Sequence, residues 1–249
     1  MPCGGRWIGS GPTDMSRVAI VAALEREVRP LVKHWRVSEK EHDGRRFRFF
    51  EKNELVLVCG GIGADAARRA AEAVIVLYGP SVVYSAGYAG SLDPRLKVGE
   101  VIRAARVVNA GDGSSAQITG GDGVLVSYPA VASPAQKLKL RESYQAQAVD
   151  MEAAAVARAA EARGVSFSAL KVISDEFDFE FPPTDRFVDS AGRFHETRFA
   201  WFAVARPWLW LPVMRLARNS GRASRILCEE IRKLEDKQLR TTLSGVERR

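Results

Sequence analysis

Histidine and cysteine, the side chains that most often hold metal ions, are scarce in this chain of 249 residues. The three histidines are scattered, and the three cysteines lack the spacing of metal ligands. The sequence therefore indicates neither a metal site nor a histidine-based catalytic triad. The odd number of cysteines also favours a reducing compartment, which predicts a cytoplasmic protein. The six residues are His34, His42, His195, Cys3, Cys59 and Cys228.

Uninterrupted apolar runs are also missing. Residues 1–14 are rich in glycine and have no apolar run, so they do not predict a signal peptide. We expect a disordered extension there, with the natural start at Met15, directly before a good strand pattern. The most apolar stretch, residues 199–214, contains three tryptophans. Arg206, Pro207 and Pro212 inside it argue against a transmembrane helix.

The composition is that of a globular protein, with 46% apolar and 27% charged residues. The length suffices for one large α/β domain with a full core. The net charge of +7 arises mainly from arginines in the C-terminal part. Such a cluster could meet nucleic acid or an anionic membrane, but a solvated helix face is the simpler interpretation, and we expect no nucleic-acid partner.

Strand and helix patterns alternate along the chain and show no internal repeat. The predicted strands cover residues 18–23, 46–51, 55–59, 81–86, 98–108, 124–129, 147–149 and 167–173. The predicted helices cover residues 24–32, 64–77, 134–142, 153–162 and 217–234.

The stretch from Val149 to Asp175 organises the prediction. A strand end runs into the acidic turn 150–152, an alanine-rich helix follows, and a buried strand ends in Ser174-Asp175. This order predicts a βαβ unit of a parallel sheet, with Glu152 and Asp175 at the edge where ligands bind. Carboxylates there either bind ligands or cap helices. A cap suits Asp150, but no helix pattern follows Asp175.

Two glycine-bearing turns are expected at the same edge. Residues 60–63 lie between a strand and a helix, where glycines let the backbone approach a ligand or a neighbouring strand. Their spacing is not the dinucleotide fingerprint, so no nicotinamide or flavin cofactor is expected. Residues 87–92 form the second turn. Glu25 and Glu27 fall in the first turn of the first helix, where stabilisation of the helix dipole would alone explain them.

Five blocks, in order and with fitting spacing, resemble the nucleoside phosphorylase and nucleosidase family, and most closely its methylthioadenosine/S-adenosylhomocysteine nucleosidases. The resemblance implies an α/β fold, a single three-layer domain at residues 15–236 with a central mixed, twisted sheet flanked by helices. It also implies a homodimer. The blocks are residues 23–28, 61–63, 89–100, 149–153 and 173–175.

The resemblance implies cleavage of the N-glycosidic bond between a purine and ribose, without metal or cofactor. Asp175 would be the general acid at purine N7, and Ser174 would help to place it. Glu152 would accept hydrogen bonds from the ribose hydroxyls, with Met151 packing under the sugar. Glu27 would orient or deprotonate the attacking water. Carboxyl groups suit these roles if burial raises the pKa of the acid and leaves the base ionised.

The remaining predicted substrate-binding residues are Gly63, Gly87, Asp150, Tyr88 and Tyr128. Tyr88 stands where the family usually has Ser or Thr, and its bulk would narrow the pocket or shift the nucleophile. Tyr128 is the nearest candidate for the aromatic side chain that stacks on the purine in this family.

Two departures from the phosphorylases favour hydrolysis. Ser85 stands where they place a phosphate-binding arginine, and the acidic segment 24–27 replaces their glycine-rich loop. A carboxylate there would repel phosphate and suit a water. A phosphate-dependent phosphorylase remains the alternative, and a non-catalytic binding module is the third hypothesis.

Residues 176–216 depart most from the nucleosidases and are predicted to be an aromatic and Pro-rich insertion, with residues 176–183 extended. They would pack on the core or at a dimer interface, or form a membrane-facing collar for a lipid-like nucleoside. This part resembles the hopanoid-associated phosphorylase branch, which implies adenosylhopane as substrate and adenine as product. A methylthioadenosine-type substrate is the alternative. We expect peripheral contact with the inner face of the membrane through residues 199–216, and a disordered tail at 237–249.

Overall fold

The computed structural model describes residues 17–182, 185–187, 189 and 192–246, so the predicted extension at 1–14 lies outside the described residues. The strands are β1 (Val18–Ala22), β2 (Arg36–His42), β3 (Arg45–Lys52), β4 (Leu55–Cys59), β5 (Val82–Ser91), β6 (Val101–Asn109), β7 (Ser115–Gln117), β8 (Gly123–Ser127), β9 (Ala148–Asp150) and β10 (Ser166–Asp175). The helices are α1 (Glu25–Val32), α2 (Ala64–Tyr78), α3 (Pro134–Tyr144), α4 (Ala153–Glu161), α5 (Glu196–Val204) and α6 (Trp210–Val246), with short 3-10 turns at Asp185–Phe187 and Pro207–Leu209.

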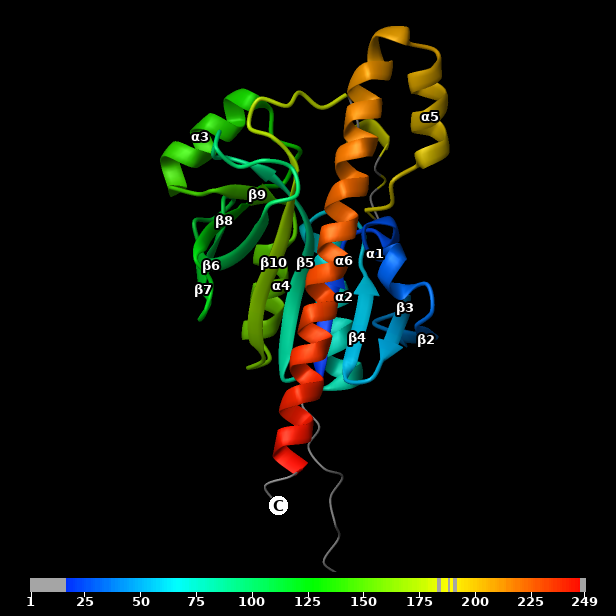
Figure 1. Ribbon diagram of the computed structural model, residues 1–249, viewed down its shortest axis with the longest axis vertical. Helices are drawn as coiled ribbons and strands as arrows, with labels where there is room; N and C mark the ends of the chain where they lie inside the picture. Colours follow the sequence, from blue (N-terminus) through cyan, green and yellow to red (C-terminus); the bar gives the residue numbers. More distant parts are fainter. Residues whose placement is uncertain (1–16, 183–184, 188, 190–191, 247–249) are drawn as a thin grey trace, which may run out of the picture.

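Alternation along β1 explains the layers. Val18 and Ile20 face a core shared with α1 and α6. Ala19 and Val21 face a second core, shared with α2 and α4. Successive side chains of a strand point to opposite faces, so an apolar strand must be covered on both sides. The predicted three-layer α/β fold is confirmed, with α6 crossing one face of the sheet and α2 and α4 behind it (Figure 1).

The sheet is mixed, as predicted. Strands β5, β9, β8, β6 and β10 follow one another by hydrogen bonding, and β10 returns to pair with β5, so these five strands form a closed ring. The sheet continues from β5 through β1, β4 and β3 to β2. Strand β5 therefore pairs with β1 over Val82–Ser85, with β10 along most of its length and with β9 at its carboxyl end.

The predicted parallel βαβ unit is wrong. Strand β9 pairs with β5 in the antiparallel direction, whereas β10 pairs with β5 in parallel, so β9 and β10 run in opposite directions. The two acidic turns still meet, because β9 is only three residues long. Val149 and Asp175 both lie opposite Gly90, near the carboxyl end of β5.

Three further differences come from long-range packing. The expected loop at 87–92 is strand as far as Ser91, because β9 and β10 hold it by hydrogen bonds. The edge strand β2 was not predicted, since its sequence is mainly polar and much of it is exposed. The last helix starts earlier than expected and extends to Val246, so residues 237–246 of the predicted disordered tail are helical. Residues 247–249 lie outside the described residues.

The insertion does not begin as the predicted extended segment. Residues 177 and 178 form a turn, in which Phe179 N donates to the carbonyl oxygen of Glu176 at 3.1 Å. Phe179 is buried while the acidic residues on either side of it are exposed. Helix α5 and the start of α6 then form a lobe that projects beyond the sheet (Figure 1). Within the described ranges, no helix is both long and apolar enough to cross a membrane.

Helix α6 is anchored by fully buried side chains, so truncation of one of them should lower the stability of the protein measurably. We expect Leu227→Ala to lower the free energy of unfolding by about 2–5 kcal/mol, because it opens a cavity against the sheet. Leu239→Ala on the same helix is the control, since Leu239 is 38% exposed, and its effect should stay within about 0.5 kcal/mol. Equal effects in denaturant unfolding would contradict this role of α6.

Candidate active site

A cavity of about 960 Å³ lies at the carboxyl end of β5. It brings together Glu27, Glu152 and Asp175, the three predicted catalytic residues, which are far apart in the sequence. Six of the seven predicted substrate-binding residues also line it, namely Met151, Ser174, Gly87, Tyr88, Gly63 and Asp150.

Glu152 is held by two backbone N–H groups. Gly63 N donates to its Oε1 at 2.9 Å, and Met151 N donates to its Oε2 at 3.2 Å. Gly63 precedes α2 with a φ of 95°, a conformation that favours glycine. The first glycine turn thus binds a carboxylate of the protein itself. Burial raises the pKa of Glu152, as does the charge of Asp150, and Lys171 and these hydrogen bonds oppose the rise.

Asp150 is engaged within the protein. Ser127 Oγ donates to its Oδ1 at 2.6 Å, while Ala153 N and Lys171 Nζ lie 2.8 and 2.9 Å from its Oδ2. The bond from Ala153 N means that Asp150 caps the start of α4, as one interpretation of the sequence proposed. Its contact with substrate stays a prediction.

Lys171 is a site residue that the sequence interpretation missed. Its side chain is 2% exposed and lies in the middle of the apolar strand β10. Burial lowers the pKa of Lys171, but the charges of Asp150, Glu152 and Glu27 outweigh this, and the net direction is upward. A lysine inside a run of buried strand residues was the available signal, because an unpaired buried charge is costly.

Glu27 lies on α1 and is 5% exposed. Burial, followed by the charge of Glu152, raises its pKa from 4.5 to about 8. Within the described part of the chain, its Oε2 has no hydrogen-bond partner. Gly87 makes room for this group, since a Cβ at that position would lie 3.1 Å from Oε2. The carboxylate can therefore approach the backbone of β5 closely.

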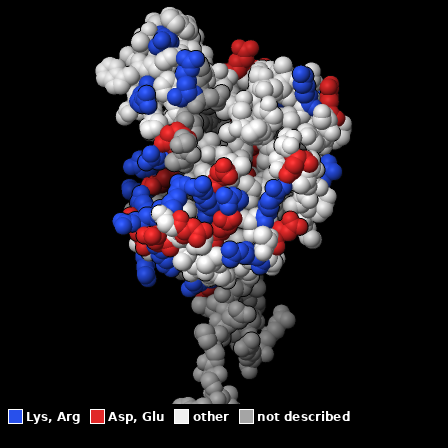
Figure 2. All heavy atoms as spheres, turned by 180° about the vertical axis from the view of Figure 1, so that it is seen from behind, with Lys and Arg blue, Asp and Glu red and all other residues white. Residues whose placement is uncertain are grey.

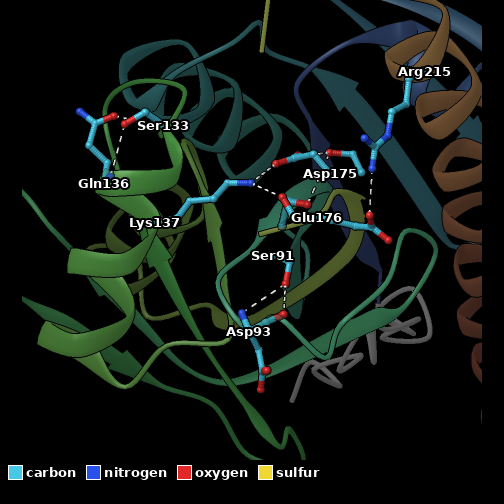
Figure 3. A network of polar contacts seen from close by, with 10 residues as sticks. Ser91, Asp93, Ser133, Gln136, Lys137, Asp175, Glu176 and Arg215 are labelled. Carbon is cyan, nitrogen blue, oxygen red and sulfur yellow. Dashed lines mark hydrogen bonds and ion pairs between the residues drawn. The ribbon is translucent and has the colours of Figure 1, made fainter. Parts of the chain in front are cut away.

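Asp175 ends β10 with both carboxylate oxygens engaged (Figure 3). Ser174 Oγ donates to Oδ1 at 2.8 Å, in agreement with its predicted placing role. Lys137 Nζ lies 2.5 Å from Oδ2 and 2.6 Å from the carbonyl oxygen of Glu176. Lys137 comes from α3 and was also missed, because nothing local to that helix indicates a partner forty residues away.

The two tyrosines take different positions. Tyr88 lines the cavity and donates through its hydroxyl to the carbonyl of Ser220 at 3.0 Å, which ties β5 to α6. Tyr128 does not line the cavity. It packs on a core cluster of β8, β9 and α3, and its hydroxyl accepts a hydrogen bond from Gln136 at 3.1 Å. This position does not support the predicted stacking on the purine. Besides Tyr88, three aromatic rings of the insertion line the cavity, namely Phe181, Phe194 and Phe199.

A cavity lined by charged side chains with shifted pKa values, at the edge of an α/β sheet, defines an enzyme that acts on a small molecule. Residues 17–141 and 122–198 match the family model of the phosphorylase superfamily. The chain belongs to the phosphorylase superfamily.

Its similarity to individual proteins agrees with this. An aminodeoxyfutalosine nucleosidase of Campylobacter jejuni is 24% identical over 67% of this chain and 91% of its own length. A 5′-methylthioadenosine/S-adenosylhomocysteine nucleosidase of Staphylococcus epidermidis is 24% identical over 70% and 93%. The crystal structure of such a nucleosidase from Helicobacter pylori, bound to an inhibitor, superposes with a TM-score of 0.63 at 21% identity, covering 88% of this chain and 99% of that one. The predicted class of enzyme, a nucleosidase, is confirmed.

The raised pKa of Glu27 makes its cost to stability dependent on pH. The folded state holds this proton up to about pH 8, whereas the unfolded chain releases it near 4.5, so the carboxyl destabilises the fold increasingly across that window. We expect Glu27→Gln to match the parent protein near pH 4.5 and to be more stable above pH 8, by about 5 kcal/mol at most.

Denaturant unfolding at both pH values measures this difference. Glu25→Gln, two residues earlier and paired with Arg48 at the surface, is the control and should change stability by less than about 1 kcal/mol at either pH. A stability gain for Glu27→Gln that is the same at both pH values would contradict the assignment.

Proposed function

We propose that this protein hydrolyses the N-glycosidic bond of a 5′-substituted adenosine and releases adenine and the ribosyl product. The observation that carries the proposal is the convergence of Glu27, Glu152 and Asp175 on one cavity. The nucleosidase relatives support the same reaction class.

Each carboxyl group has a separate part in the proposed reaction. The bond between C1′ and N9 breaks, its electron pair passes to the purine, and Asp175 gives a proton to N7. Glu152 accepts hydrogen bonds from the ribose hydroxyls, while Met151 packs under the sugar. A water adds to C1′ and gives a proton to Glu27, which acts here in its ionised form. One water is consumed, and the enzyme returns to its starting state when Glu27 releases this proton to solvent and Asp175 takes one up. Burial raises the pKa of Glu27 to about 8, so the ionised base becomes more populated as the pH rises toward that value.

Hydrolysis rather than phosphorolysis is supported by the side of the cavity near Glu27. Ser85 is buried there and offers no cation for phosphate. Arg26 and Arg225 do line the cavity, and they keep a phosphate-dependent phosphorylase as the second candidate.

The 5′ group of the substrate is proposed to be apolar. The insertion and α6 contribute an apolar wall to the cavity, which includes Phe181, Phe199, Val213 and Leu216. This wall supports adenosylhopane or a methylthioadenosine-type compound. The names of the relatives point to methylthioadenosine, S-adenosylhomocysteine and aminodeoxyfutalosine as comparison substrates. We further propose that the protein is a cytoplasmic homodimer that contacts the inner face of the membrane.

The lobe of α5 and the start of α6 supports membrane contact. All six large apolar side chains of the described residues that are more than half exposed lie between residues 201 and 214. Residues 197–228 contain six arginines and no Asp, Glu or Lys. In Figure 2 the lobe is accordingly white and blue. Exposed tryptophans beside arginines suit the surface of an anionic bilayer. Contact between two copies through this lobe would instead bring like charges together. The six side chains are Trp201, Val204, Trp208, Trp210, Leu211 and Met214.

A product assay tests the reaction. We expect adenine release from methylthioadenosine, S-adenosylhomocysteine or a lipid-linked adenosine without added phosphate. Asp175→Asn should reduce turnover by a factor of about 10² to 10⁴, because the leaving purine loses its acid. Asp178→Asn, an exposed neighbour, is the control and should leave turnover unchanged. Strict dependence on phosphate would establish the phosphorylase, and cleavage of none of these adenosines would support the non-catalytic module.

Vesicle flotation tests the membrane contact. We expect binding to phosphatidylcholine vesicles that contain phosphatidylglycerol at low salt, and weaker binding as salt screens the arginines. Replacement of Trp208 and Leu211 by serine should reduce binding at least tenfold. Leu138→Ser on α3, where the side chain is 44% exposed, is the control. No binding at low salt would exclude the contact, and a dimer that the double variant dissociates would assign the lobe to a second copy.

A further inference from the structure

Lys137 forms a buried ion pair with the proposed general acid. The side chains of Lys137 and Asp175 are only 1% and 4% exposed, and Nζ lies 2.5 Å from Oδ2 (Figure 3). The ammonium is also held by the carbonyl oxygen of Glu176 at 2.6 Å. Both groups line the cavity, so the pair lies where the purine would have to accept its proton.

The local sequence at the start of α3 fixes the position of Lys137. Ser133 caps α3 and forms a capping box with Gln136, and Pro134 opens the helix. This fixed start places Lys137 in the first turns of α3, facing β10. Such a buried lysine needs a partner of opposite charge, and the geometry supplies Asp175.

The other charged group near the pair is occupied elsewhere. The carboxylate of Glu176 pairs with Arg215 at 3.0 Å and lies 3.7 Å from Lys97. From β5, Gly90 approaches Asp175 without any side-chain charge. Lys137 is therefore the cation that contacts the Asp175 carboxylate within the described residues.

We propose that Lys137 is a positioning residue that holds Asp175 toward the purine and stabilises the carboxylate formed when Asp175 gives its proton to N7. This inference rests on the proposed nucleosidase reaction. Lys137 keeps its own protons throughout the step. Asp175 takes up a proton from solvent before the step. That proton then passes to N7, the electron pair of the broken C1′–N9 bond stays on the purine, and the new negative charge on Asp175 meets an ammonium that is already in place.

The role has a consequence for the chemical step. Without the ammonium, the new negative charge on Asp175 would form in a buried place with no cation beside it, so proton transfer to the purine should become slower. A lysine that only supports the fold would change stability without lowering kcat in the folded enzyme.

The experiment compares kcat and KM in variants of α3. We expect Lys137→Met to lower kcat about tenfold or more with a smaller change in KM. Lys137→Arg should restore much of the turnover, because it restores a cation. Lys139→Met, an exposed lysine on the same helix, is the matched control and should behave as the parent protein.

A second comparison keeps the test decisive if Lys137→Met alone does not fold. In the Asp175→Asn background both charges of the pair can be removed together, so no unpaired charge is left buried. There we expect Lys137→Met to change the residual kcat less than twofold. A further tenfold loss, or a kcat of the single variant that matches the parent protein, would overturn the inference. Failure of the parent protein to release adenine would instead overturn the proposed reaction.

Discussion

The compensation of buried charge is the constraint on which this site depends. The charges of Glu27, Glu152 and Asp150 lie close enough together to shift pKa values in this group. Lys171 is the buried cation whose charge acts on all three carboxyl groups. Without it, the carboxylates would repel one another in a region of low dielectric constant, where such repulsion is strong. Lys137 compensates Asp175 in the same way on the other side of the cavity. The protein thus keeps four carboxyl groups at one sheet edge by placing two lysines inside the fold.

The backbone around β5 allows these carboxyl groups to lie close together. Gly87 lets Glu27 approach the strand, and Gly63 presents its N–H to Glu152 at the start of α2. The three-residue strand β9 then turns the acidic segment back over the end of β5. A Cβ at position 87 would lie 3.1 Å from Glu27 Oε2, whereas at position 63 the space is open and the φ of 95° is what favours glycine. The glycines therefore position the protein's own acids and need not contact substrate to matter.

The residues proposed to cleave the bond and those proposed to select the substrate lie in different parts of the chain, before and after Asp175. Residues up to Asp175 supply the carboxyl groups, whereas Phe194 and Phe199 with α6 supply the apolar wall. Helix α5, the start of α6 and the 3-10 turn between them carry the exposed tryptophans of the lobe. One segment of the chain therefore faces both the cavity and the solvent, which links the proposed apolar 5′ group to the proposed membrane contact.

Sequence patterns alone determined most of the elements, the two-sided burial of β1, and the acidic turns that became the candidate site, because these follow from local periodicity and chemistry. They also indicated the family, since five short blocks kept their order. Only the tertiary structure decided the antiparallel direction of β9, the place of Tyr128 outside the cavity, and the partners of Lys137 and Lys171. The physical reason is that strand pairing and charge compensation join segments tens of residues apart. A local pattern records whether a side chain is buried, but it does not record which distant group it meets.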